Sequence, residues 1–501
     1  MKARVTVVLD ERIGTVHRNL FGHFAEHLGR CIYEGIWVGP DSPIPNVRGI
    51  RSDVAQALRR LDPPVLRWPG GCFADDYHWR DGIGPRETRP RRFNIHWGNA
   101  PEPNQFGTHE FVDLCRQIGA EPYVCLNLGS GSPREARESV EYCNGTGDST
   151  LTEERRRNGS PEPFGIRYWG IGNELWGCGG HLQPTAYAAE VKRYLTFLNH
   201  FGVTRIACGP RGTNPFELRR DWTLDFFREY ARVQHPSQRP VDGFALHFYT
   251  RNPAFGGDLA YSPEEYYASI QETLRMSDLI RETRAGMDAY DPGREIGLVV
   301  DEWGAWHPQA RGDTGLEQQN TMRDALLAAL TLDIFVRNSD IVAMANIAQT
   351  VNVLQAMVLT KGERMVVTPS YHVFEMYRRH QAAESVRVII DAPTVRVGAT
   401  AGPPAVAGSA SLKDGRLFLT LTNAHLEEAA DVEVALLGAE RPSARGVTGR
   451  QLAGGDIHEH NTFERPETVH PVPIAPPWKG DHRATLRLPA HSVSALELQL
   501  S

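Results

Sequence analysis

The chain has 501 residues and a formal net charge of −7, with 41% hydrophobic and 23% charged residues. This length suits one large domain and a smaller one, and the composition supports a large buried core rather than a disordered chain. The negative charge and the lack of a long basic run argue against a nucleic-acid partner. No apolar stretch reaches about eighteen residues, so the sequence predicts no membrane span.

The amino-terminal segment MKARVTVVLDERIG lacks the apolar core of a secretion signal, because Asp10, Glu11 and Arg12 interrupt it. The seven cysteines are odd in number and form no CxxC pair. This pattern fits reduced thiols better than a disulfide framework. Both observations lead us to expect a cytoplasmic protein.

Short apolar runs alternate with longer amphipathic segments through most of the chain. We expect eight strands, at residues 19–24, 65–68, 122–128, 166–172, 205–209, 243–248, 296–301 and 342–348. The clearest helices between them are expected at residues 52–61, 105–118, 184–201, 222–233, 263–287 and 317–336. This repeated strand–helix alternation predicts an α/β fold, a (β/α)8 TIM barrel, whose chemistry sits on the loops that follow the strands.

The pattern changes after about residue 377. Segments such as RLFLTLTNAH, DVEVALLG and VSALELQL alternate with period two, and Gly, Pro, Asn and Asp separate them. We therefore predict a C-terminal antiparallel β-sandwich domain. A strand-like piece at residues 3–9 precedes the barrel and is a candidate for the same sandwich. The expected division is a catalytic barrel at 18–380 and a sandwich made of 1–17 plus 381–501.

Two glutamates stand at the ends of predicted strands. Asn173 and Glu174 follow the fourth strand, and Glu302 ends the seventh. A single glutamate at a strand end is more often a surface or salt-bridged residue than a catalyst. Two of them at one barrel mouth, however, supply the carboxylate pair that glycoside hydrolysis needs.

The chemistry of glycoside hydrolysis assigns a role to each glutamate. Glu174 lies in the aromatic, glycine-rich segment YWGIGNELWGCGG, where partial burial would keep it protonated, so we predict that it is the acid/base. Glu302 would stay ionised as the nucleophile, and Asn173 would bind the hydroxyl beside the anomeric carbon. We predict a retaining mechanism through a covalent intermediate on Glu302, with no metal and no organic cofactor.

Six motifs carry a resemblance that spans essentially the whole chain. They are FGHFAEHLGRCIYEGIW at 21–37, LRWPGGCFADDYHWRDGIGP at 66–85, WGIGNELWGCGG at 169–180, LHFY at 246–249, VDEWGAW at 300–306 and ANIAQTVNVLQAM at 345–357. In these motifs the sequence resembles glycoside hydrolase family 51, the α-L-arabinofuranosidases.

The resemblance implies an exo-acting enzyme that removes terminal arabinofuranose from arabinofuranosyl oligosaccharides. It places the acid/base on Glu174 and the nucleophile on Glu302, and it implies a homo-oligomer, commonly a hexamer. The residues that it implies around the terminal furanose are Glu26, Arg67, Asn173, Tyr249 and Gln349.

One position departs from the pattern of the family. Many members have Asn after the Pro-Gly-Gly of the second motif, whereas this chain has Cys72. A thiol is a weak donor and acceptor, so we expect Cys72 to hold the exocyclic hydroxymethyl group differently. The tryptophans Trp97, Trp176, Trp303 and Trp306 are candidates for stacking on sugar faces, although we expect only one or two to touch substrate.

Several alternatives remain open from the sequence. Some of the expected pocket residues could instead have a purely structural role; Arg67, for example, could form a salt bridge that stabilises the barrel. The segment from His23 to His27, with Glu26, matches the HxxEH pattern of zinc hydrolases, but that pattern needs a helix and here follows a predicted strand. A non-catalytic sugar-binding protein is a further possibility. The same retaining chemistry would also serve a galactofuranoside, a β-xyloside or a β-glucan.

Overall fold

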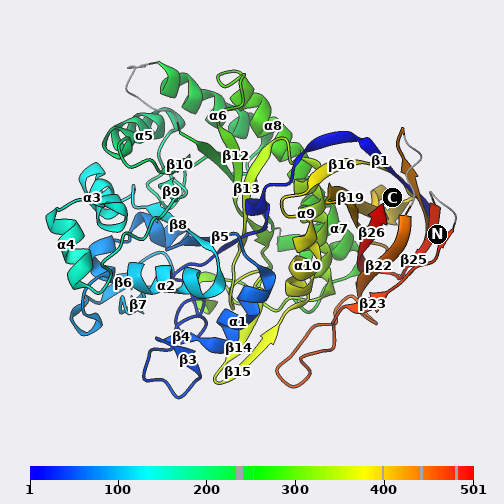
Figure 1. The fold of residues 1–501 in the computed structure, drawn as a ribbon, viewed down its shortest axis with the longest axis horizontal. Coiled ribbons are helices and arrows are strands. Elements are labelled where there is room, and N and C mark those ends of the chain that lie inside the picture. The colour runs from blue at the N-terminus through cyan, green and yellow to red at the C-terminus, as the bar shows by residue number, and fades with distance from the viewer. Residues whose placement is uncertain (233–240, 252, 398–399, 440–443, 480–482, 501) are drawn as a thin grey trace.

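The computed structural model describes residues 1–501 except 233–240, 252, 398–399, 440–443, 480–482 and 501. Within this part, eight parallel strands close into a barrel in the order β10-β11-β12-β13-β2-β5-β8-β9 (Figure 1). The barrel strands are β2 (Gly22–Phe24), β5 (Val65–Trp68), β8 (Glu121–Leu126), β9 (Tyr168–Ile171), β10 (Thr204–Ala207), β11 (Gly243–Thr250), β12 (Gly297–Ala305) and β13 (Val342–Ala348). The predicted TIM barrel is confirmed.

Helices surround the barrel. They are α1 (Ser52–Leu61), α2 (Thr108–Ile118), α3 (Pro133–Asn144), α4 (Thr150–Arg157), α5 (Pro184–Leu198), α6 (Phe216–Ala231), α7 (Pro263–Leu274), α8 (Met276–Asp288), α9 (Met322–Arg337) and α10 (Pro369–Tyr377). The helix predicted at 263–287 is two helices that meet at Arg275, a break too short to disturb the periodic pattern. The predicted end at residue 233 lies outside the described residues. No described helix has the length and apolarity to cross a membrane.

The C-terminal strands form one large sheet with the first strand of the chain. Its order is β23-β22-β26-β20-β19-β16-β1-β21-β25-β24. The members are β1 (Lys2–Thr15), β16 (Glu384–Asp391), β19 (Val406–Lys413), β20 (Arg416–Asn423), β21 (Ala430–Leu437), β22 (Ala444–Ala453), β23 (Val472–Ile474), β24 (Trp478–Lys479), β25 (Arg483–Leu488) and β26 (Ser492–Leu500). All pairings are antiparallel except that of β1 with β21.

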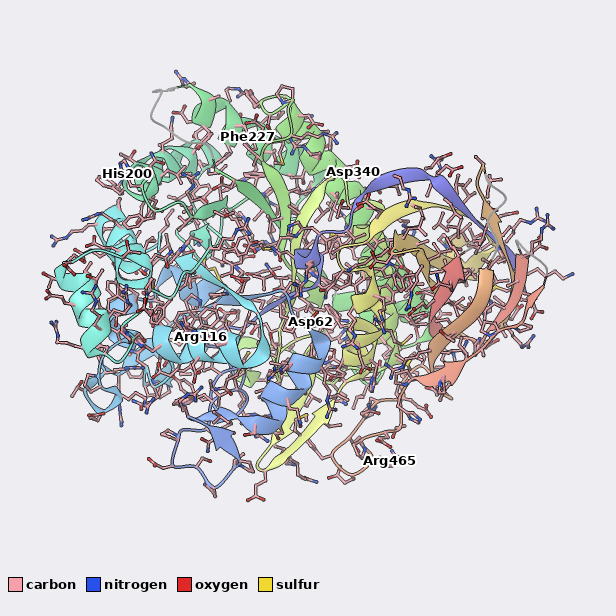
Figure 2. All side chains as sticks on the ribbon, in the orientation of Figure 1. Asp62, Arg116, His200, Phe227, Asp340 and Arg465 are labelled. Atoms are coloured by element: carbon pink, nitrogen blue, oxygen red, sulfur yellow. A yellow bond between two sulfur atoms is a disulfide. The ribbon has the colours of Figure 1, made fainter. Side chains whose placement is uncertain are left out.

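The sheet curls on itself and packs beside the barrel. One buried cluster contains Leu486 of β25 and Leu496 of β26, which belong to opposite wings of the sheet. The other face of the sheet covers α9, in which every residue from 322 to 336 is buried. Side chains fill the space between barrel and sheet (Figure 2).

Short elements complete the described fold. Four hairpins are β3 (Asn46–Val47) with β4 (Ile50–Arg51), β6 (Arg92–Asn94) with β7 (Ala100–Glu102), β14 (Val358–Lys361) with β15 (Arg364–Val367), and β17 (Thr394–Val397) with β18 (Thr400–Pro404). The 3-10 helices are η1 (Arg18–Phe21), η2 (Cys72–Asp75), η3 (Trp79–Gly82), η4 (Arg86–Thr88), η5 (Pro253–Phe255), η6 (Gly312–Thr314) and η7 (Arg378–His380).

Strand alternation aims the polar residues at the barrel mouth. Val65 and Ala245 belong to a small apolar cluster that fills the barrel interior. Side chains two residues apart on a strand share a face. Arg67, His247 and Tyr249 therefore face the inside as well, one or two steps closer to the carboxyl ends of their strands, where all eight strands present their loops.

Candidate active site

The strand β12 carries an irregularity next to Glu302. On the neighbouring strand β11, Ala245 pairs with Val299, whereas His247, two residues further on, pairs with Glu302 instead of Asp301. The register of β12 therefore shifts by one residue at this point. A bulge of this kind re-aims side chains. Asp301 and Glu302 consequently both contact Arg67 in the barrel interior, at 3.3 Å and 2.8 Å.

Arg67 is fully buried and organises the centre of the site. Its Nη1 donates to Glu302 Oε1 (2.8 Å), and its Nη2 donates to Asn173 Oδ1 (2.6 Å). Tyr249 donates its hydroxyl proton to Glu302 Oε2 (2.8 Å). A buried guanidinium requires such anionic and polar partners, and it fixes Glu302 and Asn173 relative to each other.

Glu174 follows β9 on a tight turn. Gly172 has φ +77°, and a Cβ there would lie 2.4 Å from Leu175 Cδ2, so the turn requires glycine. Asp75 in η2 accepts a hydrogen bond from the backbone N–H of Asn173 (3.1 Å) and thereby ties this turn to the loop after β5. The sequence prediction missed this role of Asp75.

His247 lies between the two glutamates. Its Nδ1 is 3.0 Å from Glu174 Oε1 and 3.6 Å from Glu302 Oε2. One carboxylate oxygen of each glutamate and a ring nitrogen of His247 all lie within 4.8 Å of one another. The prediction missed His247, although its two-residue spacing from Tyr249 on one strand was a usable signal.

The environment moves the pKa values of the two glutamates apart. Burial, together with the negative charge of Glu302, raises the pKa of Glu174 above its ordinary value. Burial also opposes ionisation of Glu302, but His247, Arg67 and Tyr249 outweigh it and lower the pKa of Glu302. One carboxyl group is thus suited to hold a proton while the other stays ionised.

Glu26 also lines the pocket. It accepts hydrogen bonds from Phe73 N (3.1 Å), Trp97 Nε1 (2.9 Å) and Gln349 Nε2 (3.0 Å). Burial and the charge of Glu302 raise the pKa of Glu26 to about 7. Trp97 therefore contacts Glu26 through its ring nitrogen, in addition to lining the pocket.

These side chains surround a cavity of about 270 Å³. A space of this size is at the small end of ligand pockets. Of the predicted site residues, the lining contains Glu26, Cys72, Trp97, Asn173, Glu174, Trp176, Tyr249, Glu302, Trp306 and Gln349. Arg67 lies directly behind it, bonded to Glu302 and Asn173.

The prediction that Trp303 stacks on substrate is wrong. Trp303 is only 1% exposed and packs against Phe335 of α9 and Phe374 of α10, outside the barrel. The cause is the pleat of β12, which sends Trp303 to the face opposite Glu302. Trp176 and Trp306 do line the cavity.

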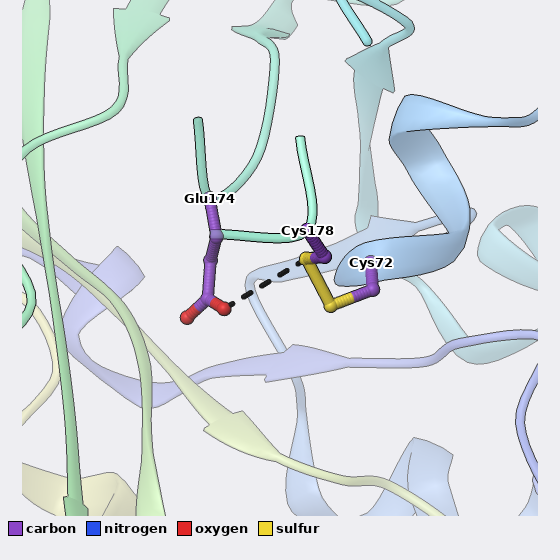
Figure 3. Close-up of side chains that lie close together, drawn as sticks. All are labelled: Cys72, Glu174 and Cys178. Atoms are coloured by element: carbon purple, nitrogen blue, oxygen red, sulfur yellow. Dashed lines mark hydrogen bonds between the residues drawn. A yellow bond between two sulfur atoms is a disulfide. The ribbon is translucent and has the colours of Figure 1, made fainter. Parts of the chain in front are cut away.

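The expectation of reduced thiols is wrong for two cysteines. Cys72 in η2 and Cys178 in the loop after Glu174 form a disulfide, with Cα atoms 5.5 Å apart (Figure 3). Cys178 Sγ lies 3.9 Å from Glu174 Oε2, and because a disulfide sulfur carries no proton this contact is packing. Cys72 thus faces the cavity as part of a disulfide and not as a thiol. The other five cysteines are free and buried.

The geometry of residues 23–27 does not support their interpretation as the HxxEH motif of a zinc hydrolase. His23 belongs to strand β2, packs on Phe374 and has its pKa lowered to about 3 by burial. His27 instead accepts from Trp68 Nε1 and contacts Glu102 through Nδ1. The helix that would align both rings on one face does not form.

A TIM barrel with two buried carboxylates at the carboxyl ends of its strands, facing one small polar pocket, is characteristic of glycoside hydrolases. Two family models match the chain, described as Alpha-L-arabinofuranosidase 1 domain over residues 57–257 and Alpha-L-arabinofuranosidase C-terminal domain over residues 301–492. The chain belongs to glycoside hydrolase family 51, the α-L-arabinofuranosidases.

Individual relatives agree over nearly the full length. The chain is 41% identical to the "Intracellular exo-alpha-L-arabinofuranosidase" of Bacteroides ovatus, with 99% of this chain and 96% of the relative covered. The GH51 arabinofuranosidase from Xanthomonas axonopodis pv. citri superposes with a TM-score of 0.93 at 41% identity, covering 99% and 100%. The Thermotoga petrophila RKU-1 enzyme gives 0.86 at 31% identity, also covering 99% and 100%.

Proposed function

We propose that the protein removes terminal α-L-arabinofuranose from oligosaccharides by a retaining double displacement, with Glu302 as nucleophile and Glu174 as acid/base. The observation that carries the proposal is the pair of carboxylate oxygens within 4.8 Å of each other. Retaining enzymes hold their carboxyl groups about 5–5.5 Å apart, whereas inverting enzymes need room for a water between them.

In the first step Glu302 attacks the anomeric carbon as the bond to the leaving oxygen breaks. Glu174, whose raised pKa favours the protonated form, gives its proton to that oxygen. Arg67 and Tyr249 hold Glu302 in position through hydrogen bonds to its two oxygens. The product is an arabinosyl ester of Glu302 and a free aglycone.

In the second step water attacks the same carbon from the side that the aglycone left. Glu174, now ionised, takes a proton from this water, and Glu302 departs as a carboxylate. His247 contacts both carboxylates and is positioned to stabilise whichever of them carries the negative charge. Two inversions return the α configuration.

The pocket favours one terminal furanose. Glu26, Gln349 and Asn173 supply polar atoms for ring hydroxyls, while the Cys72–Cys178 disulfide and Trp176 supply apolar walls. The small cavity accommodates a single sugar residue, which supports exo action. The division into a catalytic barrel at 18–380 and a second unit of 1–17 plus 381–501 is part of the same proposal.

We also propose a cytoplasmic enzyme that acts on short imported oligosaccharides and assembles as a hexamer. The name of the Bacteroides ovatus relative supports the location. The Cys72–Cys178 disulfide argues against it, because cytosolic thiols are kept reduced. Fractionation of native cells tests the location, and sedimentation of the purified protein tests the assembly; a monomer would exclude the hexamer.

The decisive experiment is a substrate panel followed by proton NMR. Aryl α-L-arabinofuranoside should be hydrolysed much faster than aryl galactofuranoside, aryl β-xyloside or a cellulose oligomer, and α-arabinose should appear before mutarotation. Release of the β anomer first would overturn the retaining mechanism. Preference for another glycoside would overturn the substrate while leaving the carboxylate pair in place.

A further inference from the structure

Two arginines at the mouth of the pocket have no role in the reaction described above. Arg211 lies in the loop after β10, and Arg251 directly follows β11, so they come from neighbouring barrel strands. Both line the cavity next to Glu174, and both are exposed. Their positions place two positive charges at the entrance of a site for an uncharged sugar.

The two guanidinium groups differ from that of Arg67 in what they contact. Within the residues that the structure describes, no carboxylate forms an ion pair with Arg211 or Arg251, in contrast to Arg67 in the same site. Each instead lies over a tryptophan face. Arg211 Cζ is 5.5 Å from the centre of the Trp176 ring, and Arg251 Cζ is 3.9 Å from that of Trp306. These contacts hold the cations at the mouth without neutralising them.

The two cations also act on each other and on the acid/base. Burial and the charge of Arg211 both lower the pKa of Arg251. Arg211 is likewise among the groups that lower the pKa of Glu174. Glu174 acts on Arg251 in turn, but a protonated Glu174 carries no charge, so the two arginines then create a local field that attracts an anion.

The arginines lie on the side where the leaving group must sit. Glu174 protonates the leaving oxygen, so groups around Glu174 contact the aglycone. Glu26 bonds to Gln349 and interacts with the charge of Glu302, the proposed nucleophile, so these two residues belong to the part of the pocket that would hold the terminal furanose. Arg211 and Arg251 therefore flank the aglycone rather than the arabinose.

We propose that Arg211 and Arg251, with Trp176 and Trp306, form a leaving-group subsite for an aglycone that carries a carboxylate. The preferred substrates are then arabinofuranosides attached to, or next to, an acidic sugar or a carboxylated aromatic group. Arginine binds a carboxylate through two parallel hydrogen bonds, and the face of a tryptophan stacks on the ring that carries the carboxylate. This inference rests on the proposed hydrolase function and names the class of aglycone.

Two matched substrates test the subsite: 4-carboxyphenyl and 4-carbamoylphenyl α-L-arabinofuranoside, which differ in charge but hardly in shape. The measurement is the ratio of their kcat/KM values. The double variant Arg211→Gln/Arg251→Gln should lower this ratio about fivefold, mainly through KM of the acidic substrate, as expected for exposed ion pairs. The wild-type ratio should also fall in high salt.

The control is Arg193→Gln, an exposed arginine on α5 that pairs with Glu190, and its ratio should equal that of the wild type. An equal loss of kcat/KM on both substrates in the double variant would overturn the proposal. The arginines would then stabilise the pocket entrance without recognising the charge of the aglycone. Hydrolysis of the neutral substrate keeps the proposed function standing in that case, whereas no hydrolysis of either substrate would refute the function itself.

A second arm separates the two sources of the carboxylate. An arabinofuranosyl oligosaccharide with a neighbouring uronic acid is compared with the same compound as its methyl ester. A preference for the acid that disappears in the double variant identifies an acidic sugar as the aglycone. A preference confined to the aryl pair identifies a carboxylated aromatic group, and no preference in either pair overturns the subsite.

Discussion

Buried carboxyl groups occur in two different settings in this molecule. At the barrel mouth, Glu174 faces a cavity and has a second carboxylate and His247 within contact. Between barrel and sheet, Asp333 of α9 is fully buried and its Oδ1 accepts hydrogen bonds from Ser409 and Thr420, each 2.6 Å. Burial raises the pKa of both Glu174 and Asp333.

The difference between these settings distinguishes a candidate catalytic carboxyl group from a structural one. Asp333 lies at a contact between a helix and the sheet, where its hydroxyl partners hold the two layers together. Glu174 has an oppositely shifted partner in Glu302 and access to a ligand. A perturbed pKa alone therefore does not identify a catalyst; the pairing and the access do.

Removing Glu302, the proposed nucleophile, should have the largest effect. We expect Glu302→Ala to lower kcat/KM on an aryl arabinofuranoside about 10⁴-fold or more, because no group remains to form the covalent intermediate. Added azide should restore turnover and give the β-arabinosyl azide. The matched control is Asp333→Asn, which removes a buried carboxylate outside the site. An equal loss of activity in that control would erase the contrast between the two settings.

Removing Glu174, the proposed acid/base, should reduce activity less, and the reduction should depend on the leaving group. We expect Glu174→Ala to lose about 10²- to 10⁴-fold on a poor leaving group and much less on dinitrophenol, which departs without a proton. The wild-type kcat/KM should fall above the raised pKa of Glu174 and below the lowered pKa of Glu302. Glu174→Ala should lose the alkaline limb of this profile; its persistence would assign that limb to another group.

The disulfide should matter for stability more than for chemistry. Cys72 and Cys178 are separated by 106 residues, and a cross-link of this span stabilises by about 5 kcal/mol in the loop-entropy account. We expect Cys72→Ser/Cys178→Ser to lower the thermal unfolding midpoint and to reduce kcat/KM a few-fold, since the loop of Glu174 is released. A phosphine reductant should reproduce both changes in the wild type and leave the double variant unaffected; equal sensitivity of the two proteins would contradict this.

Replacing Asp333 should have the smallest effect, which becomes visible only when stability is measured as a function of pH. Burial raises its pKa to about 6 from an ordinary 3.8, so the folded state holds the proton more tightly than the unfolded state. Its contribution to stability is complete below pH 3.8 and is lost as pH rises through about 6. The loss amounts to about 3 kcal/mol at most. We expect Asp333→Asn to be less pH-sensitive than the wild type between pH 4 and 7 in thermal unfolding; parallel curves would refute this.

Local patterns were enough to predict the barrel and its two catalytic candidates. Periodicity of two and of three to four residues depends on neighbours along the chain, so the eight strands could be found without tertiary contacts. Glu174 and Glu302 stand at strand ends, and parallel strands bring those ends to one mouth. The curled sheet could be predicted only as antiparallel layers, because the parallel pairing of β1 with β21 joins the two ends of the chain.

Other features of the site depend on contacts that sequence spacing does not encode. The pleat and bulge of β12 turn Trp303 outward while Glu302 points inward. The disulfide joins Cys72 and Cys178 because the loops after β5 and β9 meet in space.

The sequence by itself determined the fold class and which two carboxylates stand at the barrel mouth, since strand periodicity and strand-end position are local properties. Only the tertiary structure decided the groups that surround this pair, such as His247 between the glutamates and the arginines Arg211 and Arg251 beside them. The physical reason is that burial, pKa and charge pairing depend on distances between residues far apart in the chain.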